Sequence, residues 1–333
     1  MVSVRVVHGD ILNFPCDLVI FKHAGGFYGV DKAAAERVHF SGSLEKGQYS
    51  IIPGRSIEAR QVLFLGVGPL TDFRYAEIRE FGRRVLKIAL STAERPHHIC
   101  SPVHGPGYGL DENEAFLSLI GGFSDAINID NLGKPLEAIT IVERDTRRAE
   151  YFSALLMQNL FGEREGNERE TKARPKNRVR PESFDKQATV NLSGYGRDSK
   201  LKTRLFVAMP FAKMYSDEWE ISITEAAGAS DVICERLDEE SYVGDVLGQI
   251  KKRISEYDGL IALLNDSNPN VFLELGFAWA KDKPTILIVK EGGQLPFDVK
   301  GQRCLMYSNI ADLRKKLTNE LANLKKIGVF AQK

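Results

Sequence analysis

Short apolar runs alternate along the chain with segments in which apolar residues recur at helical spacing. In the first half the apolar runs are rich in β-branched residues, as in SVRVVHG, CDLVIFKH, QVLFLGVG, HHICSPV and LEAITIVE, and they predict buried strands. The segments RYAEIREFGRRVLKIAL and NEAFLSLIGGFSDAI have the period of an amphipathic helix. The pattern therefore predicts a first domain in which strands and helices alternate.

The second half repeats this alternation. We expect strands at RLFVAMP, DVICERLD, DGLIALLND and KPTILIVK, and helices at DEWEISITEAAGA, VGDVLGQIKKRISEY, NPNVFLELGFAWAKD and NIADLRKKLTNELANLKK. Strands this apolar, each separated from the next by a helix, predict a parallel sheet covered on both faces. The fold class we expect is α/β, with two three-layer domains.

A charged segment separates the two patterns. From 162 to 186 the sequence reads GEREGNERETKARPKNRVRPESFDK, in which charges of both signs crowd out apolar residues. This is the composition of a solvated linker, and its basic stretch 172–180 lies among as many acids, which argues against a nucleic-acid site. We extend the linker to residue 200 and expect domains at 1–161 and 201–333.

Composition narrows the class of protein. Lysine plus arginine and aspartate plus glutamate number 45 each in 333 residues, so no global field favours a nucleic acid or an anionic membrane. Four cysteines without a CxxC pair fit neither a disulfide framework nor a metal site. No basic leader followed by an apolar stretch opens the sequence, and no run of about 18 apolar residues occurs. We expect a cytoplasmic protein.

All six histidines precede residue 105, so any chemistry in the second domain proceeds without histidine.

Two glycine clusters follow predicted strands in the first domain, AGGFYGV at 24–30 and HGPGYGL at 104–110. Loops at the carboxyl ends of strands are where open α/β sheets bind ligands. Glycine lets the backbone approach a phosphate, and the free N–H groups of a helix N-terminus bind negative charge. Two such loops at similar positions predict a nucleotide site.

These loops lie in a longer stretch that resembles a macro domain. The run HGDILNFPCDLVIFKHAGGFYGVDKAAAERV is similar to the opening of that family, and KGQYSIIPG, RQVLFLGVGP and PVHGPGYGLDENEAF resemble its middle strands and second loop. The amino-terminal domain of leucine aminopeptidases has the same build. The resemblance covers about 1–160 and implies a mixed sheet that binds ADP-ribose or a relative as a signal. The signal-binding residues it implies are Asp10, Ile11, Gly25, Gly26, Gly29, Val30, His104, Gly105, Pro106, Gly107, Tyr108 and Gly109.

Within this resemblance Asp10 faces the adenine, and the two loops surround the diphosphate and distal ribose. One run departs from the family: Phe21-Lys22-His23-Ala24 stands where many macro-domain hydrolases carry Asn-Ala-Ala-Asn. We therefore favour a binding or sensing role over hydrolysis. His23 and His104 flank the loops, and the sequence leaves open whether each touches a ligand or is structural.

The second domain contains an isolated carboxylate. Asn268-Pro269 is a good helix start, and the next ten residues, 271–280, carry one charge, Glu274. No cation lies three or four residues from Glu274 on the expected helix. Because burying an unpaired carboxylate costs on the order of several kcal/mol, either a distant partner reaches it or a ligand uses it.

Other candidate binding residues lie at or just after the ends of the predicted strands RLFVA, DVICERLD and DGLIALL. Because the carboxyl ends of parallel strands share one edge, we expect these groups to meet near Glu274. The apolar segment Met209-Pro210-Phe211 is suited to stacking on a flat ring. Polar residues such as Arg236 and Asp238 are suited to binding ribose hydroxyls or a phosphate. The substrate-binding candidates are Met209, Pro210, Phe211, Arg236, Asp238, Asp266, Asn268 and Asn270.

These segments also resemble a known group. FVAMPF, CERLDE, DGLIALLNDSNPNVFLELGFAWAKDKPTILI and LPFDVKGQ are similar to nucleoside 2-deoxyribosyltransferase-like proteins and their TIR-like relatives, over about 203–320. The resemblance implies a flavodoxin-like parallel sheet, a catalytic role for Glu274, and cleavage of an N-glycosidic bond at a ribose. A carboxylate can stabilise the oxocarbenium ion or attack C1′. Nicotinamide in NAD is already cationic, so it leaves without a general acid.

Three functions remain open. The first is an NAD-cleaving effector of bacterial antiphage defence that a nucleotide signal switches on, with homo-oligomer assembly implied by the behaviour of the resembled family; NAD is then the substrate and no cofactor is needed. The second is a deoxyribosyltransferase or N-glycosidase of nucleosides or nucleotides. The third is a non-catalytic signalling adaptor whose two domains both bind nucleotides.

Overall fold

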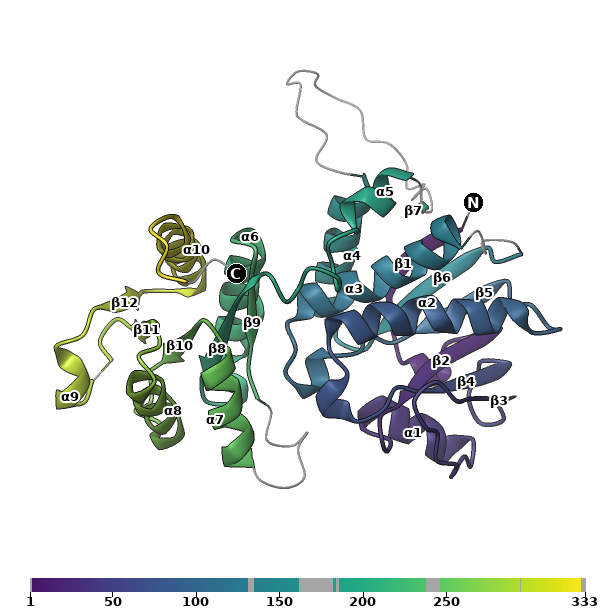
Figure 1. Cartoon of the computed structure of the whole chain (residues 1–333), viewed down its shortest axis with the longest axis horizontal. Coiled ribbons are helices and arrows are strands. Elements are labelled where there is room, and N and C mark those ends of the chain that lie inside the picture. The colour runs from purple at the N-terminus through teal and green to yellow at the C-terminus, as the bar shows by residue number, and fades with distance from the viewer. Residues whose placement is uncertain are drawn as a thin grey trace, which may run out of the picture. The chain divides into compact units, whose positions relative to one another are not determined.

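The computed structural model describes residues 2–130, 135–161, 182–183, 186–237, 246–293 and 295–330. The chain divides into two compact units (Figure 1). The first comprises Met1–Gly105 and Glu114–Arg197, and the second comprises Pro106–Asn113 and Asp198–Lys333. Asp238 lies outside the described residues, as does 162–181, the greater part of the charged segment.

The first unit is built on a mixed sheet. Its described strands are β1 Ser3–His8, β2 Leu18–His23, β3 Tyr49–Pro53, β4 Gln61–Gly66, β5 His98–Ser101, β6 Ala138–Glu143 and β7 Glu182–Ser183. They lie in the order β3-β4-β2-β5-β6-β1-β7, with β3 and β7 antiparallel to their neighbours and the others parallel. β2 is buried along its whole length and pairs with β4 from Leu18 to His23, so the first glycine loop begins where the sheet ends.

Helices cover both faces of this sheet. They are α1 Gly29–Arg37, α2 Tyr75–Ser91, α3 Glu112–Ser124, α4 Thr146–Phe161 and α5 Lys186–Asn191, with the short 3₁₀ turns η1 Ile11–Asn13 and η2 Leu70–Asp72 and the π-helical segment η4 Asp125–Ile129. Alternate residues of β4 face opposite sides. Phe64 belongs to the apolar cluster under α1, whereas Leu65 shares a cavity wall with Phe81 of α2. Phe116 of α3 stacks on Phe152 of α4, with ring centroids 4.7 Å apart.

The second unit contains a parallel sheet. Its described strands are β8 Thr203–Ala208, β9 Val232–Glu235, β10 Gly259–Leu263, β11 Thr285–Lys290 and β12 Cys304–Tyr307, in the order β12-β11-β10-β8-β9. Every described pair is parallel. Renumbered within the unit this is the flavodoxin-like order 2-1-3-4-5, which confirms the predicted fold class.

Two apolar layers enclose this sheet. The second unit's helices and turns are η3 Pro106–Tyr108, η5 Lys213–Tyr215, η6 Glu218–Ile223, α6 Thr224–Ala229, α7 Val246–Glu256, α8 Pro269–Ala280, α9 Phe297–Lys300 and α10 Ile310–Lys326. One cluster packs α6, η6 and α10 against the sheet through residues such as Trp219 and Leu317. The other packs α7 and α8 through residues such as Ile254 and Leu275. The strands are therefore buried on both faces, as their apolar runs predict.

The structure corrects the predicted linker over 186–197. Residues 186–191 form α5, and Leu192 is fully buried. This part of the chain belongs to the first unit rather than to a solvated connection.

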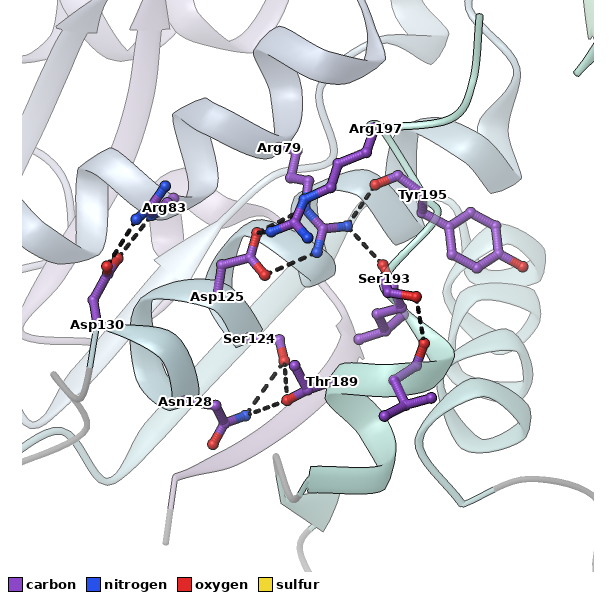
Figure 2. A network of polar contacts seen from close by, with 12 residues as sticks. Arg79, Arg83, Ser124, Asp125, Asn128, Asp130, Thr189, Ser193, Tyr195 and Arg197 are labelled. Carbon is purple, nitrogen blue, oxygen red and sulfur yellow. Dashed lines mark hydrogen bonds and ion pairs between the residues drawn. The ribbon is translucent and has the colours of Figure 1, made fainter. Parts of the chain in front are cut away.

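A buried arginine holds this segment, as Figure 2 shows. Arg79 of α2 makes a bidentate pair with Asp125, through Nε···Oδ2 and Nη2···Oδ1 distances of 2.7 and 2.9 Å. Its Nη1 donates to the carbonyl oxygen of Leu192 at 2.6 Å and to that of Tyr195. Arg197 also donates to Asp125 at 2.9 Å. Arginine is suited to this role because its planar fork carries five donors in fixed geometry.

Candidate functional site

The carboxyl edge of the second sheet provides a binding position. The chain passes from β8 to β9 on one side and then returns to β10 on the other side of β8. The loops that leave β8 and β10 therefore diverge, and open α/β sheets bind ligands in the crevice at such a reversal. Met209-Pro210-Phe211 follows β8, and Asp266 and Asn268 follow β10.

The lip after β8 combines apolar side chains with an arginine. Met209 and Pro210 are buried, whereas Phe211 is 46% exposed. The guanidinium of Arg236, which follows β9, lies 5.2 Å from the Phe211 ring centroid and 4.6 Å from that of Trp219. Its Nη1 lies 4.0 Å from the Met209 sulfur. Arginine stacks favourably on aromatic faces, so these contacts hold a cation beside an exposed ring.

The turn after β10 leads directly into α8. Asn268 is the N-cap: its side-chain oxygen accepts hydrogen bonds from the backbone N–H groups of Asn270 and Val271, at 2.9 and 3.4 Å. Pro269 occupies the first helical position. This is the helix start that the sequence predicts. Because the Asn268 side chain satisfies two helix donors, it has a structural role at this position.

Glu274 lies in the second turn of α8. Its side chain is half-buried, and it takes part in an interaction within the structure. The sequence predicts a buried carboxylate that is reached either by a distant partner or by a ligand; the structure corrects the burial, which is partial. Asn270, one turn earlier on the same helix, is exposed, so this face of α8 presents an amide and a carboxylate near the carboxyl edge.

Further polar groups at this edge escaped the sequence analysis. Tyr215 is buried, and this burial together with the nearby Asp266 carboxylate raises the pKa of its phenol. Tyr307, at the end of β12, donates to Glu218 at 2.8 Å and accepts from Asn265 at 2.7 Å. These residues come from four separate segments. The one feature of the sequence that could have pointed to them is that each follows or ends an apolar strand.

In the first unit the loop 24–28 joins β2 to α1, which begins at Gly29. Gly25 and Gly29 have φ angles of +69° and +52°, a region that favours glycine, and both are exposed. Gly26 accepts a backbone hydrogen bond from Ala24 at 3.0 Å. Val30, in the first turn of α1, is half-buried. The backbone here has the tight turn and open surface that a phosphate loop requires.

A buried charge cluster underlies this loop. Lys22 of β2 forms an ion pair with Asp31 in the first turn of α1, and both side chains are almost completely buried. His104 Nδ1 lies 4.0 Å from Asp31, and its Nε2 is buried without a partner among the described residues. Burial lowers the pKa of His104 well below its ordinary value, and the Lys22 charge adds to the effect. Burial raises the pKa of Asp31, and Lys22 partly offsets this.

The other candidates of the first unit have local partners. Asp10 caps η1 by accepting from the backbone N–H of Leu12 at 3.0 Å and from the Asn13 side chain at 2.9 Å. Ile11 is buried. His23 is also buried, with Nδ1 3.0 Å from the carbonyl oxygen of Leu44, so it has a structural contact.

The second glycine run is divided between the units. His104 and Gly105 belong to the first, whereas Pro106, Gly107, Tyr108 and Gly109 belong to the second. Within the second unit Tyr108 is buried, and a Cβ atom at Gly109 would lie 1.8 Å from the carbonyl oxygen of Arg236. Gly109, at φ +88°, is therefore required for close approach to the end of β9. Gly107 is exposed and has open space around it.

A small cavity of about 140 Å³ lies in the first unit at the carboxyl end of β4. Its wall is mainly apolar, with Leu65, Phe73 and Phe81, and Lys46 and Arg84 contribute positive charge. The sequence analysis did not single out this cavity.

The described residues lack two kinds of feature. No helix combines the length and apolarity that a membrane crossing requires. No group of three or more histidine, cysteine, aspartate or glutamate side chains there is arranged to hold a metal ion.

Comparison with known proteins identifies solved structures similar to part of the chain. The macrodomain of Oceanobacillus iheyensis with ADP is 17% identical, with 45% of this chain and 88% of that one covered and a TM-score of 0.35. The Trypanosoma brucei macrodomain in complex with ADP is 16% identical over 46% and 69% of the two chains, with a TM-score of 0.39. The macro domain of ganglioside induced differentiation associated protein 2 is 14% identical over 47% and 83%, with a TM-score of 0.38.

All three are macrodomains, the family that the motifs of 1–160 resemble. No model of a known protein family matches the sequence, and no curated protein matches it significantly.

Proposed function

We propose that the second unit hydrolyses NAD to nicotinamide and ADP-ribose, and that a nucleotide signal bound by the first unit switches this activity on. In this reaction the bond between C1′ and the nicotinamide nitrogen breaks. Its electron pair moves to the nitrogen, which loses its positive charge. The oxygen of a water molecule bonds to C1′, and one proton passes to the solvent.

The observation that carries the proposal is the position of Glu274. It is a half-buried carboxylate in the second turn of α8, and that helix starts from the edge at which strand order reverses. A carboxylate there can stabilise the oxocarbenium ion or attack C1′. The second domain contains no histidine, and this reaction needs none.

Other residues at the carboxyl edge of the sheet suit the remainder of NAD. Phe211 offers an exposed ring for stacking, and Arg236 beside it supplies a charge for the diphosphate. Asp266 is an exposed carboxylate at the same edge and accepts hydrogen bonds from ribose hydroxyls.

The signal-binding proposal rests on the first glycine loop and on the macro-domain motifs. Gly25 and Gly29 have the backbone conformations of a phosphate loop, and α1 follows directly. The ligand we propose is ADP-ribose or a related nucleotide. Assembly into a homo-oligomer on activation, a cytoplasmic location and a role in antiphage defence complete the proposal.

The direct test is nicotinamide release from NAD by the purified full chain at high protein concentration. The assay is run alone, with ADP-ribose, with cyclic nucleotides and with an extract of phage-infected cells. We expect release that rises with one of these additions. If no condition gives release but deoxynucleosides exchange their bases, the enzyme is a deoxyribosyltransferase. If neither reaction occurs, the chain is a nucleotide-binding adaptor.

A further inference from the structure

The cavity at the carboxyl end of β4 lies against one face of α2. Five side chains that are neighbours on this helix face line it: Ala76, Glu77, Glu80, Phe81 and Arg84. The lining residues from outside the helix are Lys46, Leu65, Gly66, Val67 and Phe73. Every lining residue belongs to the first unit, so the cavity forms within one compact body.

The apolar part of the wall has the dimensions of a single ring. Leu65, Phe73 and Phe81 are buried, and the rings of Phe73 and Phe81 meet edge to face with centroids 6.0 Å apart. The buried ring of His104 also packs edge-on against Phe81, with 4.9 Å between the centroids. The cavity volume of about 140 Å³ is close to the roughly 150 Å³ of an engineered apolar cavity that binds benzene.

Four charged side chains line the same cavity, two of each sign: Lys46, Glu77, Glu80 and Arg84. Arg84 Nη2 donates to the carbonyl oxygen of Gly47 at 3.2 Å, and Glu77 Oε2 accepts from the backbone N–H of Arg74 at 3.3 Å. Within the described part of the chain, none of the four is in an ion pair. Charges of both signs are therefore available to a ligand beside an apolar space.

Local packing positions the two cations. A Cβ atom on Gly47 would lie 2.9 Å from Arg84 Nη2, so the guanidinium rests directly on the glycine backbone. The Lys46 side chain packs on Gly68, with its Cδ 3.6 Å from the position of a Cβ atom there. Glu80 lies one turn before Arg84, a spacing that places their Cβ atoms about 5–6 Å apart. An ammonium and a carboxylate on one carbon atom can therefore reach Glu80 and Arg84 together.

We propose that this cavity binds an apolar α-amino acid, with its side chain against Phe73 and Phe81, its carboxylate on Arg84 and its ammonium on Glu80. A ligand with a single charge would meet like charge in the wall and leave the opposite charge unmatched. A zwitterion matches both signs, and its apolar side chain is removed from water in a space of its own size. Binding here requires neither NAD cleavage nor the nucleotide signal, so the site is independent of the proposed function.

The test measures binding of L-phenylalanine and L-leucine to the purified full-length protein by isothermal titration calorimetry. Three analogues each lack one feature: 3-phenylpropionate has no ammonium, 2-phenylethylamine has no carboxylate, and glycine has no side chain. We expect at least one of the two amino acids to bind, and each analogue to bind about tenfold or more weakly than that amino acid. No binding of either amino acid, or equal binding of a singly charged analogue, overturns the proposal.

Two charge substitutions locate the bound amino acid. Arg84→Met should weaken its binding by about tenfold, and it should not weaken that of 2-phenylethylamine, which has no carboxylate. Glu80→Gln should weaken it by about threefold, because Glu80 is exposed, and it should not weaken that of 3-phenylpropionate. If the affinity for the amino acid is unchanged in both variants, the ligand binds elsewhere and the proposal is wrong.

Lys87→Met is the matched control for Arg84→Met. Lys87 is an exposed cation three residues later on α2, and it is not among the residues that line the cavity. We expect its removal to leave the affinity for the amino acid within about twofold of the parent, as for a distant solvated charge. Equal losses in Lys87→Met and Arg84→Met would reduce the effect to the general charge of the helix and overturn the assignment.

A change of volume tests the cavity without altering a charge. Ala76→Leu adds three carbon atoms to the wall and should abolish binding of L-phenylalanine, whereas Ala76→Ser, which is close to alanine in size, should retain it. Thermal unfolding verifies that both variants are folded. Unchanged binding in folded Ala76→Leu would show that the amino acid does not occupy this cavity.

Discussion

The carboxylate of Asp111 accepts a hydrogen bond from the backbone N–H of Cys234, over an Oδ2···N distance of 3.1 Å. Asp111 follows the second glycine run and Cys234 lies in β9, and both belong to the second unit. In the described sheet β9 is an edge strand, paired with β8. The segment 106–113 therefore covers an edge that would otherwise expose backbone donors.

Gly109 makes this contact possible, and Gly109→Ala tests it. The added Cβ would overlap the carbonyl oxygen of Arg236, and φ is positive there, so we expect the second unit to lose about 2 kcal/mol or more of stability. Chemical denaturation followed by tryptophan fluorescence measures this loss, since both tryptophans, Trp219 and Trp279, lie in that unit.

Gly107→Ala is the control for Gly109→Ala. Open space surrounds Gly107, and its φ is not positive, so the same added methyl should change stability by no more than about 0.5 kcal/mol. Equal effects of the two substitutions would show that 106–113 does not pack on β9 as described.

Removing Arg79 should destabilise the first unit. In Arg79→Met the carbonyl oxygens of Leu192 and Tyr195 lose their donor, and buried Asp125 keeps the half-exposed Arg197 as its cation. Breaking a buried pair in this way costs about 3 kcal/mol or more. Hydrogen exchange of the backbone amides of 192–197 should accelerate together with the loss of stability.

Arg83→Met provides the comparison within the same network (Figure 2). Arg83 also forms a bidentate pair, with Asp130, but its side chain is 34% exposed. A solvated pair of this kind contributes no more than about 1 kcal/mol. A cost for Arg83→Met that matches the cost for Arg79→Met would contradict the role assigned to burial.

His104 should make the first unit less stable in mild acid. Its pKa is lowered on folding, so the unfolded chain binds a proton that the folded chain does not bind. Its contribution is therefore fully present above the unfolded pKa near 6.5 and declines as pH falls below it, by up to about 1.4 kcal/mol per pH unit. Asp31, whose pKa is raised, acts in the opposite direction.

The difference between the parent and His104→Gln isolates this group. Unfolding free energies measured from pH 7.5 to pH 5 should fall more steeply for the parent than for the variant. Parallel curves would mean that His104 is protonated or solvated in the folded protein.

Arg236 should contribute to substrate affinity through both the positive charge and the planar shape of its guanidinium group. Arg236→Met removes the charge, and Arg236→Lys keeps it while losing the flat stacking contacts with Phe211 and Trp219. We expect KM for NAD to rise by about tenfold or more in Arg236→Met and less in Arg236→Lys. Steady-state kinetics check this, and an unchanged KM in Arg236→Met would remove Arg236 from the site.

Much of the fold of the second unit can be predicted directly from the sequence. The run DGLIALL is apolar throughout, and it forms β10 in the centre of a sheet that is buried on both faces. The start of α8 at Asn268-Pro269 is equally clear, because the N-cap signal depends on local chemistry alone.

Contacts between residues far apart in the chain cannot be predicted from such local sequence signals. The polar composition of 186–200 predicts a linker, yet Leu192 is buried, and Arg79, more than a hundred residues earlier, donates a hydrogen bond to its carbonyl oxygen. Glu274 illustrates the opposite error. Its apolar neighbours on α8 imply full burial, but the Glu274 side chain is half-buried.

The central claim is that the carboxylate of Glu274 cleaves NAD. The most direct measurement is the rate of nicotinamide release by the full chain, by Glu274→Gln and by Glu256→Gln, whose exposed side chain ends α7 at the opposite end of the sheet. We expect Glu274→Gln to lower the rate by about 100-fold or more, and Glu256→Gln to leave it unchanged. Equal rates in the parent and Glu274→Gln would contradict the account.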